Sequence, residues 1–281
     1  MSIWTSINHL PLTQRYVQVG EWRTRVLETG EGPALVLMHG TGGHVEAFTR
    51  NLEALARDHR VIAYDFPGHG YTTHADRDLE IADYVDHLRQ LMEVLGISSA
   101  HLCGESLGGW VAIKFAAAHP ELVDRLVLNT PGGTMATPEV MERIRSLSQA
   151  AADDPSPERI RARLEWLMAD PSSVTDELVD VRRGIYSQPG FADSMRHLLC
   201  LQDPEIRARN LVSDDELRSI RNPALVIWTS DDPSGPAGAG MAMADTLPGG
   251  EFQLISGAGH WPQWEQPEAY DRLMLDFLTG R

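Results

Sequence analysis

The sequence has little cysteine, no long apolar run and fewer basic than acidic residues. Its two cysteines, Cys103 and Cys200, supply no disulfide framework for 281 residues, so we expect free thiols in a reducing compartment. No apolar run approaches the ~20 residues that a membrane span requires. The N-terminus also lacks the basic stretch and following apolar run of a signal peptide. These absences predict a cytoplasmic protein that does not bind membranes.

The shortage of basic residues argues against a nucleic-acid partner. Lysine and arginine together number 24, against 40 aspartates and glutamates, so the formal net charge is −16. A surface of that sign repels phosphate backbones and anionic membranes. Any anionic small-molecule substrate would then need a positively charged side chain in its binding site to overcome repulsion by the negatively charged protein.

The common patterns of metal and nucleotide sites are also missing. The sequence has no His-Glu-x-x-His pattern and no paired Cys-x-x-Cys motifs. Gly238-Ala239-Gly240 lacks the preceding strand and the spacing of a phosphate-binding loop. We therefore predict neither a metal nor a cofactor.

What the sequence does contain is an alternation of apolar strands with amphipathic helices. Strands apolar on both faces are typical of a parallel sheet that helices cover on both sides. The predicted strands are a pair within 15–29, then 34–38, 61–64, 99–103, 126–129, 224–228 and 251–255. The predicted helices between and after them are 44–58, 79–95, 107–118, 237–247 and 267–278. The predicted fold class is α/β, with a mainly parallel central sheet.

The middle of the chain interrupts this alternation. From residue 134 to 220 the periodicity is helical, and no convincing buried strand occurs. Proline-containing turns at 153–157 and 169–173 separate the helices. We expect an inserted helical cap at 134–220, between a first part of the α/β core at 1–133 and a second part at 221–281.

One pentapeptide has the pattern of a serine nucleophile turn. Gly104-Glu105-Ser106-Leu107-Gly108 reads G-x-S-x-G and lies between a predicted strand and a predicted helix. A sharp strand-to-helix turn presents a serine hydroxyl as a nucleophile, and small flanking residues relieve the crowding. We therefore predict Ser106 as the nucleophile. The amide of Leu107, free at a helix N-terminus, is a predicted oxyanion donor.

A serine nucleophile needs a base and an orienting acid, which come from loops at the carboxyl ends of strands. His260 follows the last predicted strand, whereas the other ten histidines lie in positions better suited to packing, bracing or lining a pocket. The acid is Asp231 or Asp232, after the strand that ends at Trp228, and counting from the strand end favours Asp232. The order Ser, Asp, His along the chain is typical of this fold.

The second oxyanion donor is predicted in the glycine-rich loop after the first buried strand. That loop reads His39-Gly40-Thr41-Gly42-Gly43, and the amide of Thr41 is the best candidate donor. Gly42 beside it is expected to face the substrate. A plain tight turn would need the same glycines, and it is compatible with this role.

These motifs together resemble the α/β-hydrolase superfamily from about residue 15 to the end of the chain. Within it, the chain is similar to the meta-cleavage product hydrolases, which cut carbon–carbon bonds in products of aromatic ring degradation. Three segments carry this closer resemblance: Gly259-His260-Trp261-Pro262-Gln263-Trp264-Glu265 around the histidine, 126–133 at the opening of the lid, and 173–182 in the cap. The family spacing supports Asp232 as the acid.

The resemblance also implies substrate-binding residues. Arg182 matches the inward arginine of the family's cap helix, where its guanidinium would bind a carboxylate. Trp261 would line the apolar part of the pocket. Glu105, where the family usually has asparagine or a small residue, would also face the substrate.

The resemblance implies hydrolysis of a carbon–carbon bond in a 2-hydroxy-6-oxo-hexa-2,4-dienoate-type compound. A carboxylesterase or lactonase with the same triad is the alternative, and a non-catalytic relative is a third hypothesis that the complete triad disfavours. The expected partner is a small carboxylated dienol-ketone. We also expect a homo-oligomer, a dimer or larger.

Overall fold

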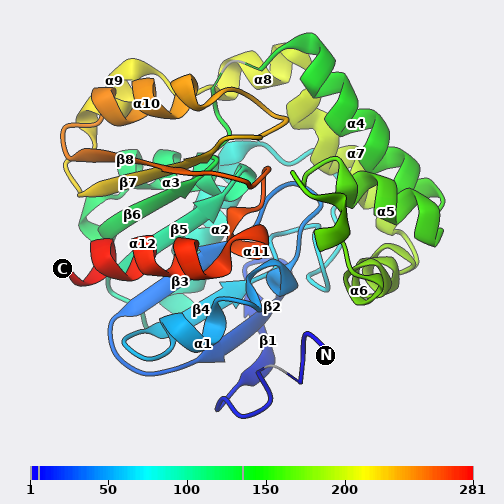
Figure 1. Cartoon of the computed structure of the whole chain (residues 1–281), viewed down its shortest axis with the longest axis horizontal. Helices are drawn as coiled ribbons and strands as arrows, with labels where there is room; N and C mark the ends of the chain where they lie inside the picture. The colour runs from blue at the N-terminus through cyan, green and yellow to red at the C-terminus, as the bar shows by residue number, and fades with distance from the viewer. Residues whose placement is uncertain (1, 6, 135, 281) are drawn as a thin grey trace.

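A computed structural model describes residues 2–5, 7–134 and 136–280. At its centre lies one eight-stranded sheet in the order β1-β2-β4-β3-β5-β6-β7-β8 (Figure 1). The strands are β1 (Thr13–Val19), β2 (Trp22–Thr29), β3 (Ala34–Met38), β4 (Arg60–Tyr64), β5 (Ala100–Glu105), β6 (Val123–Asn129), β7 (Ala224–Thr229) and β8 (Gly250–Ile255). Only β2 runs antiparallel to both of its neighbours, β1 and β4; the remaining pairs are parallel. The predicted α/β fold class is confirmed.

Helices cover both faces of this sheet. Alternate residues of β3 show why both faces must be covered: Val36 and Met38 enter one apolar cluster, and Leu35 and Leu37 enter the other. The helices of the first face are α2 (Ile81–Val94), α3 (Leu107–Ala118) and α10 (Ala237–Thr246). Those of the second are α1 (Leu52–Leu55), α11 (Pro262–Glu265) and α12 (Pro267–Thr279). Short 3-10 turns lie at η1 (Val45–Phe48) and η2 (Pro120–Leu122).

The described residues between β6 and β7 form helices joined by turns and contain no strand. Its helices are α4 (Pro138–Asp153), α5 (Pro157–Glu165), α6 (Asp176–Tyr186), α7 (Phe191–Leu198), α8 (Pro204–Asn210) and α9 (Asp214–Ser219), with 3-10 turns η3 (Pro171–Ser173) and η4 (Leu199–Gln202). Figure 1 shows α4 to α7 grouped at one end of the sheet, whereas α9 lies beside α10. The division into core and cap at residues 134 and 220 stays a prediction.

The predicted long helix at 44–58 is wrong. The segment instead forms only the 3-10 turn η1 and the single helical turn α1. The cause is a buried ionic cluster. Arg25 pairs with Glu46 and Asp65 at 2.7 Å each, and Asp65 Oδ1 accepts a hydrogen bond from the amide of Val45. These contacts hold the backbone of 45–48 through the side chains of Arg25 on β2 and Asp65 after β4, so local helical periodicity does not decide its conformation.

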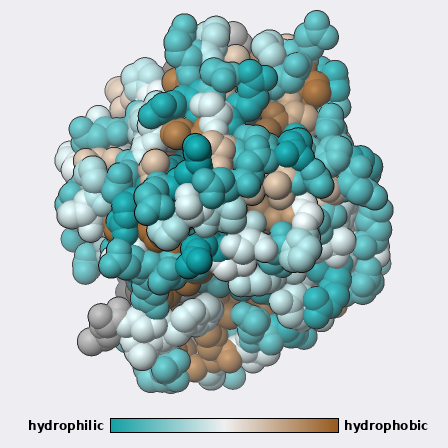
Figure 2. Space-filling model, turned by 90° about the vertical axis from the view of Figure 1, so that its right-hand side faces the viewer, coloured by the Kyte–Doolittle hydropathy of each residue, from teal (hydrophilic) through white to brown (hydrophobic). Residues whose placement is uncertain are grey.

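The outer surface of the molecule is mostly hydrophilic on the cap side, where apolar side chains occur singly or in small groups (Figure 2). Both cysteines are buried and free. No helix in the described ranges has the length and apolar character needed to traverse a bilayer.

Candidate active site

Ser106 lies at the turn between β5 and α3, at the carboxyl edge of the sheet. Its φ of +53° is in the left-handed region, which is rare for a residue with a side chain. The flanking glycines make this turn feasible. A Cβ on Gly104 would lie 2.2 Å from the backbone of Gly108, and one on Gly108 would lie 2.3 Å from the carbonyl oxygen of Met38. The strained turn at Ser106 is therefore held by close backbone packing on both sides.

His260 and Asp232 meet beside this turn, although they follow different strands. Nδ1 of His260 lies 3.0 Å from each carboxylate oxygen of Asp232. The amide of Ser234 donates to Asp232 Oδ1 at 2.8 Å and holds the carboxylate in place. Asp231 instead accepts a hydrogen bond from Ser230 and is exposed. Of the two aspartates, the structure brings Asp232 to the imidazole.

The electrostatics of this pair favour a charged imidazole. Burial lowers the pKa of His260, but the charges of Asp232 and then of Glu105 outweigh it, so the pKa is raised overall. For Asp232, burial raises the pKa, but the charge and hydrogen bond of His260 leave it below the ordinary value. Asp232 thus remains ionised and stabilises the imidazolium that a general base forms.

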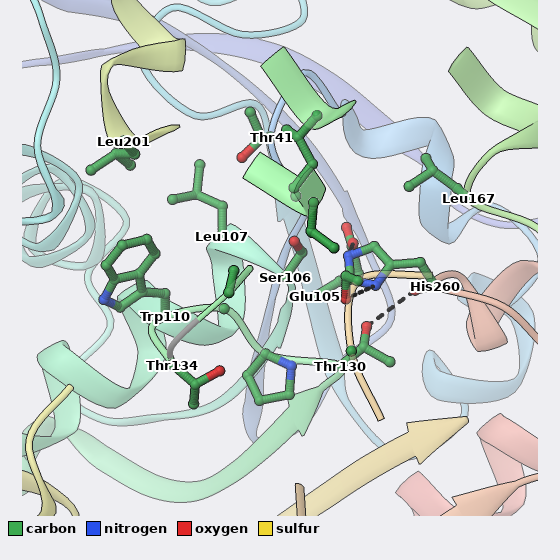
Figure 3. Close-up of a pocket in the computed structure, with 18 of the residues that line it drawn as sticks. Thr41, Glu105, Ser106, Leu107, Trp110, Thr130, Thr134, Leu167, Leu201 and His260 are labelled. Atoms are coloured by element: carbon green, nitrogen blue, oxygen red, sulfur yellow. Dashed lines mark hydrogen bonds and ion pairs between the residues drawn. The ribbon is translucent and has the colours of Figure 1, made fainter. Parts of the chain in front are cut away.

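Glu105 is the unusual member of the site. Its side chain is 1% exposed, and Oε1 lies 3.3 Å from Nε2 of His260 (Figure 3). Burial is the main cause that raises the pKa of this carboxyl, against opposing effects led by the charge of His260. The imidazole therefore lies between two carboxyl groups, Asp232 at Nδ1 and Glu105 at Nε2.

Ser106 and His260 line the same cavity, but no hydrogen bond links Ser106 Oγ to the imidazole in this part of the structure. Contacts of this kind are commonly long in ligand-free sites and shorten when substrate binds. In Figure 3, Ser106 lies between Trp110 and Leu201 on one side and His260 and Leu167 on the other. The geometry therefore admits a serine–histidine–aspartate triad.

The cavity holds about 100 Å³, room for several water molecules. Residues at the strand ends of the sheet and residues of the cap helices α4, α5 and α8 line it. Thr41, Leu107, Glu105 and Trp261 are among its lining residues, as predicted from the sequence for substrate or oxyanion contacts. Leu107 opens α3, so its amide has no acceptor within the helix. The amides of Leu107 and Thr41 are thus candidate donors to an oxyanion.

Gly42 and Arg182 lie beside the cavity but are not among its lining residues. The carbonyl of Gly42 accepts a hydrogen bond from the hydroxyl of Tyr186 at 2.9 Å. Arg182 is 1% exposed, lies 5.2 Å from the ring of Trp261, and donates from Nε to His44 at 3.4 Å. Its Nη2 has no hydrogen-bond partner among the described residues.

Two cationic residues of the cavity were not predicted from the sequence. Arg163 on α5 and Arg207 on α8 both line the cavity, Arg163 with 3% exposure and Arg207 half-buried. Arg163 belongs to the run Arg159-Ile160-Arg161-Ala162-Arg163, in which alternate arginines look alike. Helical periodicity places Arg163 on the same face as the buried Ile160, three residues before it. This spacing is the sequence feature that could have indicated that Arg163 is buried.

The segment after His260 fastens the cap to the core. The amide of His260 donates to the carbonyl of Leu167, and the Nε1 of Trp264 donates to the carbonyl of Ser173 at 3.0 Å. Glu265 accepts from the amides of Gly259 and Asp170 at 2.7 and 2.9 Å. The sequence signature around the histidine is therefore largely a set of cap contacts, which position the imidazole.

No group of three or more His, Cys, Asp or Glu residues able to hold a metal ion occurs in the described ranges. Comparison with known families gives a match from residue 33 to 267 to the family described as alpha/beta hydrolase fold. The chain belongs to the α/β-hydrolase family.

Its relatives within this hydrolase family have consistent names. It is 34% identical to the 2-hydroxy-6-oxononadienedioate/2-hydroxy-6-oxononatrienedioate hydrolase of Paraburkholderia phymatum, over 95% of this chain and 96% of the relative. It is 32% identical to the 2-hydroxy-6-oxo-6-phenylhexa-2,4-dienoate hydrolase of Burkholderia cepacia, over 95% and 97%. The solved meta-cleavage product hydrolase of Pseudomonas fluorescens IP01 superposes with a TM-score of 0.84 at 28% identity, over 95% and 97% of the two chains. This α/β hydrolase is an enzyme similar to meta-cleavage product hydrolases.

Proposed function

We propose that this hydrolase cleaves a carbon–carbon bond in a 2-hydroxy-6-oxo-hexa-2,4-dienoate-type acid. Ser106 is the nucleophile, His260 the acid–base group and Asp232 its orienting carboxylate. The observation that carries the proposal is the buried pair of His260 and Asp232 beside the cavity that Ser106 lines. Arg163 lines the same cavity and has no carboxylate partner among the described residues. The triad supports hydrolysis, and the cationic roof supports an acidic substrate.

The reaction has two stages in this site. His260 first moves the proton of the dienol hydroxyl to C5, which makes the C6 carbonyl an isolated, electrophilic ketone. Ser106, or a water that it orients, then adds to C6, and the oxyanion accepts hydrogen bonds from the amides of Leu107 and Thr41. The C5–C6 bond breaks, its electron pair passes into the dienolate, and the carboxylic acid of the C6 side is released after water attack.

A carboxylesterase or lactonase is the second candidate, and Glu105 is the observation that favours it. A buried carboxyl beside the nucleophile disfavours a second anion nearby, whereas a neutral ester meets no such repulsion. The two functions share the triad and differ in the pocket.

The test compares a yellow ring-cleavage dienol acid with p-nitrophenyl butyrate at equal enzyme concentration. We expect rapid bleaching of the dienol and slower ester turnover, with both lost in Ser106→Ala and retained in Ser98→Ala, an exposed serine. Rapid ester turnover with a persistent dienol would establish the esterase instead. A cytoplasmic location and a homo-oligomeric state belong to the same proposal, and light scattering of the purified protein measures the second.

A further inference from the structure

The loop that supplies the second predicted oxyanion donor is held from the core on one side. It follows β3, and within it the amide of Gly43 donates to the carbonyl of Gly40 at 2.9 Å. Nδ1 of His39 lies 2.8 Å from the same carbonyl. Because the amide of Phe66 donates to Nε2 of this ring at 3.1 Å, Nδ1 carries the proton and donates to the carbonyl of Gly40. His39 therefore supports the loop from the sheet.

A second support comes from the cap. Tyr186 on α6 is 2% exposed, and its hydroxyl donates to the carbonyl of Gly42 at 2.9 Å. The ring of Tyr186 packs on that of Phe191, with the ring centroids 4.5 Å apart. Gly42 has a φ of +70°, and a Cβ on it would lie 2.6 Å from the hydroxyl oxygen of Tyr186. The glycine therefore allows the cap to approach the loop closely at this point.

These contacts form one directed chain of hydrogen bonds. Tyr186 donates to the carbonyl of the peptide unit between Gly42 and Gly43. The amide of that unit donates to the carbonyl of the unit between Gly40 and Thr41. A peptide unit is planar, so the position of its carbonyl fixes the direction of its amide, and successive hydrogen bonds of this kind polarise one another. The chain ends at the amide of Thr41, which has no acceptor among the described residues.

We propose that Tyr186 is a positioning residue for the oxyanion hole and acts through the carbonyl of Gly42. Thr41 lines the cavity, whereas Tyr186 and Gly42 do not, so the effect of the tyrosine hydroxyl passes through the loop. It should therefore appear when charge develops on the substrate oxygen, and substrate binding should change little. This inference rests on the proposed function only in taking Ser106 as the nucleophile and the amide of Thr41 as an oxyanion donor.

The first test is the steady-state kinetics of Tyr186→Phe with p-nitrophenyl butyrate, which forms an oxyanion without a preceding ketonisation. The substitution removes the hydroxyl and keeps the ring that packs on Phe191. We expect kcat to fall by roughly fivefold to tenfold, less than on removal of an oxyanion donor itself, and KM to stay within about twofold. Tyr84→Phe on α2 is the matched control, because the hydroxyl of Tyr84 is buried and has no hydrogen-bond partner among the described residues. The control should retain kcat within about twofold.

A second test separates oxyanion stabilisation from a general loss of packing. The probe is pentyl trifluoromethyl ketone: Ser106 Oγ adds to its carbonyl carbon, the hydroxyl proton passes to His260, and the carbonyl oxygen becomes an oxyanion. Pentyl methyl ketone, which binds as the intact ketone, is the ground-state counterpart. We expect Tyr186→Phe to weaken inhibition by the trifluoromethyl ketone by the same factor as it lowers kcat. Inhibition by the methyl ketone should be unchanged, and urea denaturation shows that the variant is folded under the assay conditions.

Three results would overturn the inference. These are an unchanged kcat in Tyr186→Phe, a rise in KM without a fall in kcat, and equal weakening of inhibition by both ketones. The last result would mean that Tyr186 serves only to pack the cap on the loop. Failure of the proposed function gives a different result: an enzyme that hydrolyses the ester and leaves the dienol unbleached would disprove carbon–carbon cleavage, while the effect of Tyr186→Phe on oxyanion formation would still stand.

Discussion

At the residue scale, the site is organised around His260, which lies between Asp232 and Glu105 at 3.0 and 3.3 Å. Asp232 orients the imidazole by its contact with Nδ1. Glu105 contacts Nε2, the nitrogen that must accept the proton in either stage of the proposed reaction. The two carboxyl groups therefore have different effects, and substitutions separate them.

Replacing Asp232 by asparagine should remove most activity. The amide preserves the shape of the side chain but cannot stabilise the imidazolium, so kcat should fall by about 10²-fold to 10⁴-fold. Its neighbour supplies a matched control, because Asp231 is exposed and contacts Ser230. Asp231→Asn should retain kcat within about twofold. Steady-state kinetics of both variants decide between the two aspartates, and a loss confined to Asp231→Asn would reverse the assignment.

Replacing Glu105 by glutamine should move the acidic limb of the pH–rate profile. Glu105 helps to raise the pKa of His260, and His260 must be neutral to act as a base. Without that carboxylate the imidazole loses its proton at lower pH, so the acidic limb of kcat/KM should shift to lower pH. Glu158→Gln, at an exposed position on α5, is the control. An unchanged profile in Glu105→Gln would show that Glu105 is protonated throughout the working range.

At the scale of elements, the turn from β5 to α3 could be recognised from sequence because its requirements are local. Two glycines flank the serine since backbone from α3 and β3 approaches within 2.3 Å of any added Cβ. The predicted helix at 44–58 failed for the opposite reason. Its conformation depends on contacts with Arg25 and Asp65, which come from other segments of the chain. The sequence of 44–58 alone therefore does not predict these contacts.

Replacing Gly108 by alanine should destabilise the fold. The new methyl group would lie 2.3 Å from the carbonyl oxygen of Met38, so β3 and α3 must separate. We expect the free energy of unfolding to fall by about 1–3 kcal/mol. Gly238→Ala on α10 is the control, because nothing lies within 4 Å of its added Cβ. Urea denaturation measures both, and equal stability of Gly108→Ala and the unmodified protein would contradict the packing argument.

At the scale of the whole molecule, an acidic surface surrounds a cavity with cationic side chains in its roof. The net charge of −16 would repel an organic acid at long range, whereas the buried guanidinium of Arg163, which lines the cavity, would attract it at short range. Dissolved salt screens the exposed charges within a Debye length of ~8 Å at physiological ionic strength, and it screens buried ones much less.

Added salt should therefore raise kcat/KM for the acidic substrate. Raising the ionic strength from about 0.01 M to about 0.15 M shortens the Debye length from ~30 Å to ~8 Å. We expect kcat/KM for the dienol acid to rise over this range, while that for p-nitrophenyl butyrate stays level. Initial rates at several ionic strengths with both substrates provide the measurement. A fall in kcat/KM for the acid alone would mean that exposed cations, rather than Arg163, dominate its capture.

The sequence by itself determined the fold class, the nucleophile turn and the candidate histidine, because each leaves a local pattern: strands apolar on both faces, glycines around a serine, a histidine after the last strand. Tertiary structure alone decided which guanidinium lines the cavity and that Glu105 contacts Nε2 of His260. Counting along the sequence favoured Asp232 over Asp231, and the tertiary structure brings Asp232 to the imidazole. These depend on how α5, α6 and the strand ends pack against one another. The direction of a side chain on a cap helix depends on its neighbours in space, which the periodicity of its own helix leaves unspecified.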